Sequence, residues 1–209
     1  MNPNRKRPPT IVHAVVYPVV TLIFWLMGWK TKGSLPHLPK FVLIFAPHTS
    51  YMDNYLLAPI QALYRFEGMW LAAEKLFKNP FLRAFLLFAG ARPVDRSHSA
   101  NLVERYITEF KRHDYYILGI APEGTRHARD TWRSGFYHIA IGADVPIVCL
   151  SFDYKRKEVE IGCVVYPTGD IEADMEPITA FYAGKMGRHP ERMTPVAVSI
   201  PADQARKAG

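Results

Sequence analysis

The sequence is poor in the residues that build disulfide frameworks and metal centres. It has two cysteines in 209 residues, Cys149 and Cys163, and neither belongs to a C-x-x-C pair or shows zinc-ligand spacing. Its eight histidines are scattered, without an H-E-x-x-H motif. We therefore expect reduced thiols, no disulfide-dependent secreted fold and no bound metal ion. A G-x-S-x-G motif is also missing, which argues against the usual serine hydrolase chemistry.

Acidic residues are absent from the first 40 positions, which contain six Lys and Arg residues. The rest of the chain carries 20 basic and 19 acidic residues, so almost the whole net charge of +7 comes from this segment. A nucleic-acid-binding protein carries its positive charge on the folded domain. Here the charge flanks an apolar segment instead, which is the pattern expected beside anionic lipid head groups. We therefore expect a membrane surface as a partner, and no nucleic acid.

An apolar run long enough to cross a bilayer comfortably is missing too. Residues 11–28 would reach about 27 Å as a helix, whereas the hydrocarbon core of a bilayer is about 30 Å thick. Pro18 interrupts this run, and Trp25 and Trp29 suit the lipid–water interface. We expect a membrane-associating helix that lies in the interface, with an ordinary buried helix as the alternative. The predicted parts of the chain are a basic tail with this helix (1–35), a main domain (36–200) and a loose tail (201–209).

Beyond residue 40, short apolar runs alternate with segments of helical periodicity. This alternation is typical of an α/β domain, in which helices flank a largely parallel sheet. The predicted strands are 41–46, 69–73, 115–121, 145–152 and 159–165, and the predicted helices are 49–66, 74–88 with a break near Pro80, 101–112, 135–142 and 174–183.

The segment PHTSYMD, residues 47–53, follows the first of these strands, at a position where α/β folds usually bind ligands. If His48 precedes the next helix and Asp53 lies in its first turn, the carboxylate can orient the imidazole and stabilise its protonated form. His48 would then act as a general base. Ser50 and Asp53 also have the spacing of a helix capping box, in which Asp53 only starts the helix. The two interpretations are compatible, and the spacing leaves both open.

Two further polar segments contain arginines. APEGTR, residues 121–126, comes after a strand; Gly124 permits a tight turn, and Arg126 has the planar fork that binds a phosphate. GARPVDR, residues 90–96, lies between two predicted helices and ends in Arg96, which could bind a second side of the same phosphate. Taken alone, each segment favours a plain surface turn with a solvated or neutralised arginine.

Taken together and in this order, the motifs resemble those of the glycerolipid acyltransferase family, whose best-known members are the 1-acyl-sn-glycerol-3-phosphate acyltransferases. H-x4-D, G-x-x-x-V-D-R, P-E-G-T-R and V-P-I-V recur at family-like intervals over residues 41–150. An isolated H-x4-D is weak evidence, but one followed by E-G-T-R about 70 residues later is specific. The resemblance implies an O-acyltransferase that uses no metal, no cofactor apart from its acyl donor, and no enzyme nucleophile.

The resemblance also implies roles for individual residues. His48 matches the family's general base and Asp53 its partner, while Arg96 matches the arginine that binds the acceptor phosphate. Four consecutive residues match the block that serves acceptor binding and catalysis: Glu123, Gly124, Thr125 and Arg126.

The implied reaction transfers a fatty acyl group from acyl-CoA or acyl-carrier protein to the hydroxyl of a lysophospholipid, with 1-acylglycerol-3-phosphate as the first candidate. The chain departs from the family pattern at Pro93, Ala121 and Cys149, which leaves another lipid acceptor open. A lipid-binding protein of the same fold and a lipid hydrolase are the alternatives. Both acyl donors are made in the cytoplasm, so we expect the protein to be membrane-associated, at the cytoplasmic face of the inner or plasma membrane.

Overall fold

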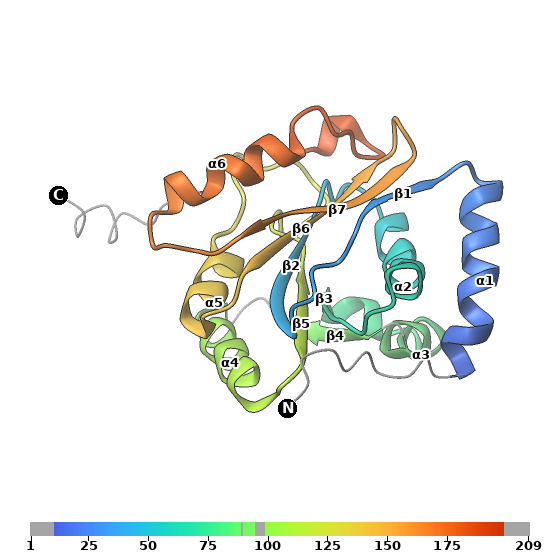
Figure 1. Cartoon of the computed structure of the whole chain (residues 1–209), viewed down its shortest axis with the longest axis horizontal. Helices are drawn as coiled ribbons and strands as arrows, with labels where there is room; N and C mark the ends of the chain where they lie inside the picture. Colours follow the sequence, from blue (N-terminus) through green and yellow to red (C-terminus); the bar gives the residue numbers. More distant parts are fainter. Residues whose placement is uncertain (1–10, 89, 95–98, 199–209) are drawn as a thin grey trace.

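A seven-stranded sheet with helices on both faces forms the centre of the molecule (Figure 1). The computed structural model describes residues 11–88, 90–94 and 99–198. The strand order is β1-β7-β6-β2-β5-β3-β4, and every neighbouring pair is parallel except β6 and β7. The predicted α/β fold with a largely parallel sheet is confirmed. The strands are β1 (Lys30–Gly33), β2 (Lys40–Ala46), β3 (Met69–Ala73), β4 (Ala91–Val94), β5 (Tyr116–Ile120), β6 (Ile147–Asp153) and β7 (Glu158–Val165).

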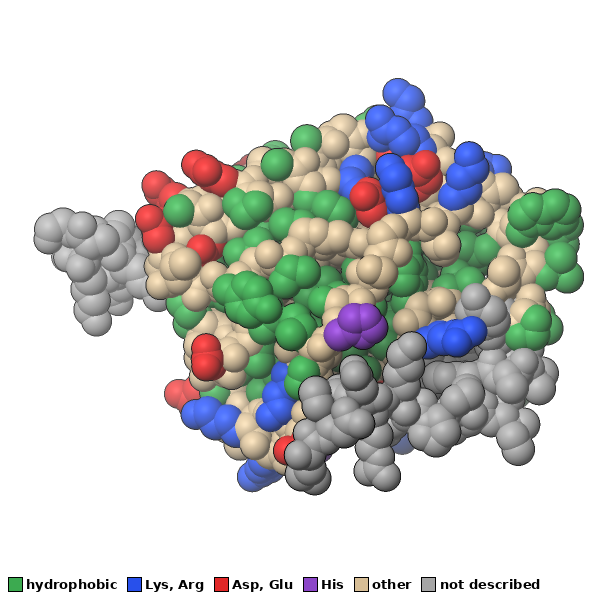
Figure 2. All heavy atoms as spheres, viewed as in Figure 1, with side chains coloured by type: hydrophobic (Ala, Val, Ile, Leu, Met, Phe, Trp, Pro, Cys, Tyr) green, Lys and Arg blue, Asp and Glu red, His purple; other side chains and the backbone are tan. Residues whose placement is uncertain are grey.

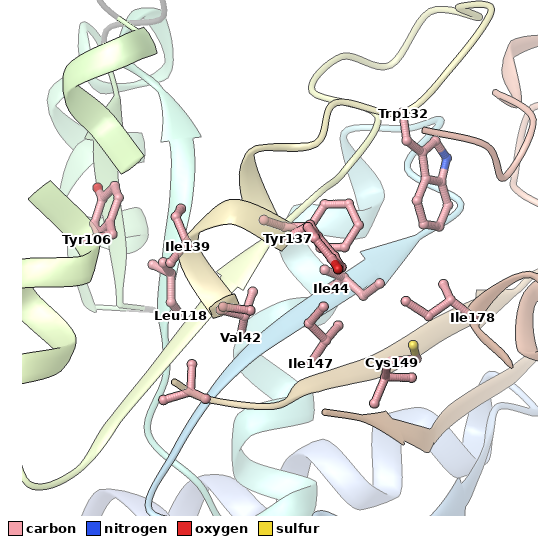
Figure 3. Close-up of a cluster of buried hydrophobic side chains, with 14 of the residues drawn as sticks. Val42, Ile44, Tyr106, Leu118, Trp132, Tyr137, Ile139, Ile147, Cys149 and Ile178 are labelled. Atoms are coloured by element: carbon pink, nitrogen blue, oxygen red, sulfur yellow. The ribbon is translucent and has the colours of Figure 1, made fainter. Parts of the chain in front are cut away.

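The central strands are buried on both faces, as continuous apolar runs in parallel sheets usually are. Because successive side chains of a strand point to opposite faces, β2 contributes to two cores. Val42 and Ile44 share one core with side chains of α4, α5 and α6, part of which Figure 3 shows. Phe41, Leu43 and Phe45 share the other with α1 and α2. The helices are α1 (Ile11–Leu26), α2 (Met52–Tyr64), α3 (Pro80–Phe88), α4 (Ser99–Arg112), α5 (Gly135–Ala143) and α6 (Ile171–Tyr182).

The N-terminal helix α1 packs beside α2 at one end of the molecule (Figure 1). Its 16 residues reach roughly 24 Å, and no helix among the described residues is long and apolar enough to cross a membrane. Phe24 and Trp29 are buried in the core, so the prediction that Trp29 lies in a lipid interface is wrong: it packs edge-on against Tyr154 instead, with 5.1 Å between ring centroids. Trp25, by contrast, is 72% exposed. Residues 1–10 and 199–209 lie outside the described residues.

Two strands were not predicted, and both lie at edges of the sheet. β1 has the sequence KTKG and is exposed throughout, so it lacks the apolar alternation that marks a strand. β4 contains Pro93, which cannot donate a ladder hydrogen bond and is tolerated at an edge. Three predicted helices also start elsewhere: those expected from residues 49, 101 and 174 begin at Met52, Ser99 and Ile171. The start at Ile171 follows from Asp170, whose side chain accepts the backbone N–H of Ala173 at 3.2 Å and caps the helix.

Candidate active site

The site lies at the carboxyl ends of two neighbouring central strands. β2 pairs in parallel with β5, so the loops that follow these strands meet at one edge of the sheet. The backbone N–H of His48, after β2, donates a hydrogen bond of 3.0 Å to Oε1 of Glu123, after β5. The sheet therefore brings together two motifs whose residues are 75 positions apart in the chain.

His48 and Asp53 form a buried pair. Nδ1 of His48 lies 3.1 Å from Oδ2 of Asp53, and the two residues are 7% and 0% exposed. His48 lies in the loop before α2 and Asp53 in its first turn, which is the arrangement predicted from the spacing. In the tautomer that donates Nδ1–H to the carboxylate, Nε2 carries the lone pair and is the nitrogen able to accept a proton.

The same carboxylate also organises the start of α2. Oδ2 of Asp53 accepts the backbone N–H of Ser50 at 2.9 Å, and Oγ of Ser50 accepts the N–H of Met52 at 3.1 Å. The residue at the N-cap position is Tyr51 rather than the predicted Ser50, and its side chain makes no capping bond. The sequence suggested two roles for Asp53, as the partner of His48 and as part of a helix cap. Its Oδ2 makes both contacts, one with the imidazole and one with the backbone N–H of Ser50.

Tyr154 binds the other carboxylate oxygen and was not predicted. Its hydroxyl donates to Oδ1 of Asp53 at 2.5 Å. Burial, together with the charge of Asp53, raises the pKa of Tyr154 well above its usual value, so the hydroxyl keeps its proton. Tyr154 directly follows β6, which neighbours β2 in parallel. Its place at the carboxyl end of a central strand was the available signal, but it belongs to no recognisable motif.

Glu123 is buried behind the His48 loop, with 1% of its surface exposed. Oε1 accepts the N–H of His48, whereas Oε2 has no hydrogen-bond partner among the described residues. Burial raises the pKa of Glu123 to about 7; the charge of Asp53 adds to this effect and the bond from His48 opposes it. Within the described part of the chain, no group of three His, Cys, Asp or Glu side chains lies close enough together to hold a metal ion.

The rest of the EGTR block forms a turn beside the H-x4-D loop. Gly124 has φ +65°, the left-handed conformation that glycine favours, and its N–H donates to the carbonyl of Ala121 at 3.0 Å. The guanidinium of Arg126 lies over the ring of Tyr51, 3.7 Å from its centroid. Thr125 is partly exposed, and its Oγ1 accepts the N–H of His127 at 3.4 Å. Arg126 is thus held against the loop that contains His48. Arg96, the remaining predicted residue, lies outside the described residues.

A segment after α6 packs against the H-x4-D loop and was also not predicted. The N–H of His189 donates to Oγ1 of Thr49 at 3.1 Å. Gly187 approaches the same loop so closely that a Cβ there would lie 2.7 Å from that hydroxyl and 3.2 Å from Cβ of Pro47. The carbonyl of Met186 accepts the N–H of Tyr154 at 2.9 Å. The segment 186–189 therefore contacts both the H-x4-D loop and Tyr154.

Comparison with known proteins agrees with this geometry. No curated protein matches the chain. Among solved structures, the 1-acyl-sn-glycerophosphate (LPA) acyltransferase PlsC from Thermotoga maritima has a similar fold, with a TM-score of 0.53 and 20% identity over 78% of this chain and 73% of that one. Residues 32–153, which include the H-x4-D and EGTR motifs, match the model of the Acyltransferase family. That match spans more than half of the sequence, and the chain therefore belongs to the acyltransferase family.

Proposed function

We propose that the protein is a lipid acyltransferase that transfers a fatty acyl group from acyl-CoA or acyl-carrier protein to the hydroxyl of a lysophospholipid, with 1-acylglycerol-3-phosphate as its acceptor. The observation that carries this proposal is the buried His48–Asp53 pair at the carboxyl edge of the sheet. An imidazole whose Nδ1 is held by a carboxylate is arranged to accept a proton at Nε2. The family match supports the reaction class, and the fold shared with an LPA acyltransferase supports a lysophospholipid as the acceptor.

In the proposed reaction the acceptor alcohol has the role that serine has in hydrolase triads. Nε2 of His48 takes the proton of the acceptor hydroxyl while its oxygen attacks the thioester carbonyl carbon. The tetrahedral intermediate then collapses, the C–S bond breaks, and His48 returns the proton to the leaving thiolate. Asp53 stabilises the imidazolium in between, and Tyr154 holds the carboxylate in place through its second oxygen.

The polar residues around this pair are proposed to bind the acceptor. Arg126 is suited to a phosphate because its guanidinium is planar and is held at the mouth of the site by Tyr51. We assign Arg96 to the same phosphate, on the family resemblance alone. Glu123, Gly124 and Thr125 shape the turn that positions Arg126. The carboxyl group of Glu123 also accepts the backbone N–H of His48, so it links this turn to the H-x4-D loop.

We further propose that the protein is a monotopic membrane protein with its catalytic site facing the cytoplasm. The outer surface of α1 is apolar, with exposed side chains at Val19, Leu22, Ile23, Trp25 and Leu26. Figure 2 shows hydrophobic side chains at the end of the molecule where Figure 1 places α1, next to a group of Lys and Arg side chains. An apolar face beside cations suits the boundary between lipid tails and anionic head groups. Phe81 of α3, 87% exposed, offers a second contact with lipid.

The test is an acyl-transfer assay in which the thioester donor and the lysolipid acceptor are supplied separately. Acyl transfer that requires both substrates is the expected result. Thioester hydrolysis without acceptor would identify a hydrolase instead, and lipid binding without thioester consumption would identify a binding protein. His48→Ala should lower turnover by about 10²–10⁴-fold, the usual loss when a general base is removed. Near-normal transfer by a folded His48→Ala protein would refute the mechanism.

A further inference from the structure

A cavity of about 190 Å³ lies next to the His48–Asp53 pair, between the end of α1, the first turns of α2 and the β6–β7 turn. It is smaller than the roughly 300–1,000 Å³ pockets that enclose whole drug-sized ligands, so it fits one part of a larger molecule. None of the motifs found in the sequence contributes to it apart from Met52 of H-x4-D. Its lining residues are Met27, Trp29, Met52, Leu56, Tyr154, Lys157 and Arg188.

The cavity shares a wall with the catalytic pair. Tyr154 lines it and donates a hydrogen bond from its hydroxyl to Asp53, and Met52 directly precedes Asp53 in α2. A group bound in the cavity is therefore separated from the Asp53 carboxylate by a single side chain. On its outer side the cavity reaches Met27, which is 46% exposed and follows the apolar surface of α1. The cavity thus connects the proposed lipid-facing surface with the catalytic pair.

Two cations stand in this otherwise apolar lining, and neither has a carboxylate partner among the described residues. Lys157 uses one N–H of its ammonium group on the carbonyl of Met27, at 3.0 Å, and an ammonium group has three. Arg188 makes no hydrogen bond or ion pair within the described part of the chain. Its guanidinium is nevertheless close enough to Tyr154 to oppose the effect of burial on the pKa of that hydroxyl.

Two neighbouring cations, by contrast, each have a carboxylate partner. Arg156 is bound to Asp153 at 2.6 Å, and Lys185 is bound to Glu160 at 2.5 Å. Lys157 and Arg188 differ from these two cations because they have no carboxylate partner among the described residues, and they differ from the exposed Lys155 because they line the cavity. Cations left unpaired beside an apolar cavity are suited to an anion that is attached to an apolar chain.

We propose that Lys157 and Arg188 bind a phosphate group of one of the two substrates, whose adjoining chain packs against Trp29 and Leu56. The proposal rests on the proposed function for the identity of those substrates. If the acyl donor supplies the phosphate, this site is additional to the one assigned to Arg126; if the acceptor supplies it, this site replaces that assignment. The phosphate belongs either to the head group of the lysophospholipid or to the phosphorylated carrier of the acyl donor. The chemistry of the site is the same in both cases, so the experiment distinguishes the two sources.

The experiment measures equilibrium binding to the full-length protein with two matched pairs of probes. 1-Oleoylglycerol-3-phosphate is compared with 1-oleoylglycerol, both as monomers, and coenzyme A is compared with pantetheine. Arg188→Gln and Lys157→Gln remove the two charges. Lys155→Gln removes a charge from the same exposed turn, at a position that does not line the cavity. In both test variants the phosphate-bearing probe of one pair should bind about tenfold more weakly, while its phosphate-free counterpart and the Lys155→Gln control stay unchanged.

Weaker binding of 1-oleoylglycerol-3-phosphate places the acceptor's phosphate in the cavity, and weaker binding of coenzyme A places the donor's phosphate there. Test variants that bind all four probes like the wild type overturn the site. A loss shared by the phosphate-free probes also overturns it, because such a loss reports damage to the cavity rather than a missing charge. Binding is measured without turnover, so a wild-type protein that binds the probes but transfers no acyl group would refute the proposed function and leave this site standing.

Discussion

At the scale of single residues, Asp53 makes more polar contacts in the site than any of its neighbours, although none of its surface is exposed. It faces the His48 ring and the Ser50 backbone with one oxygen, and the Tyr154 hydroxyl with the other. A buried carboxylate is stable only when such partners replace its lost hydration. Each partner therefore contributes both to folding and to the orientation of the imidazole.

Tyr154→Phe tests this double role because it keeps the ring and removes only the hydroxyl. Oδ1 of Asp53 would lose its donor without gaining access to water, and a hydrogen bond to a charged group is worth roughly 1.5–3 kcal/mol. We expect the free energy of unfolding to fall by about this amount and kcat to fall about tenfold. Urea unfolding and steady-state kinetics on the same protein measure both. A loss of stability with kcat unchanged would mean that Tyr154 has no part in positioning the pair.

Glu123 should make the stability of the folded protein depend on pH. Its pKa is about 7 in the folded protein, raised mainly by burial from an ordinary value of 4.5. Between these values the unfolded chain releases its proton and the folded chain keeps it, so stability falls as the pH rises through this window. The loss is about 3 kcal/mol by pH 7 at about 1.4 kcal/mol for each pH unit.

Glu123→Gln removes this titration and can still accept the N–H of His48 through its amide oxygen. The free energy of unfolding of the variant minus that of the wild type should therefore increase from pH 4.5 to pH 7. Above pH 8 this difference should be constant. Chemical unfolding of both proteins at several pH values provides the measurement. A difference that stays the same from pH 4.5 to pH 8 would show that Glu123 ionises at its ordinary pKa.

At the scale of elements, the segment 186–189 contacts the H-x4-D loop, and we expect it to hold that loop in shape. Gly187→Ala would place a methyl group 2.7 Å from Oγ1 of Thr49, so the loop or the segment must move. We expect a loss of stability of about 1–3 kcal/mol, the usual effect of overpacking, together with a lower kcat. Gly135→Ala is the matched control, because a Cβ at that position meets nothing within 4 Å. Equal behaviour of the two variants, measured by thermal melting and kinetics, would contradict this role.

The elements also show how far the sequence alone can predict this molecule. β3 is found at its observed bounds and β2 and β6 nearly so, because buried strands have uninterrupted apolar runs. His48 and Asp53 are found because their contact is local, within five residues. Tyr154 and Gly187 are missed, because only the order of strands in the sheet and the path of the chain after α6 bring them to the loop. Single-sequence patterns can locate the ends of strands, but they do not show which strands are neighbours in the sheet.

At the scale of the whole molecule, the outer surface of α1 is predicted to determine where the protein works. Replacing Trp25 and Leu26 together by glutamine removes two side chains that are 72% and 68% exposed, so the fold should be retained. Burial of a large apolar side chain is worth about 1.5–3 kcal/mol, so binding to anionic vesicles should weaken at least about tenfold. Ile141→Gln on α5, 39% exposed and on the other layer, is the control. Vesicle flotation that is unaffected by the double substitution would place the membrane contact elsewhere.

The pairing of β1 with β7 has a consequence for the order of events during synthesis. Lys30 is aligned with Glu158, so the strand that follows α1 can join the sheet only after the ribosome has made almost all of the domain. At about 5–20 residues per second, this interval lasts on the order of ten seconds. During that time α1 can pack only against elements made earlier, such as α2, while the loop around His48 still lacks Tyr154 and Gly187. The proposed membrane-binding helix is therefore synthesised well before the contacts that complete the surroundings of the His48–Asp53 pair.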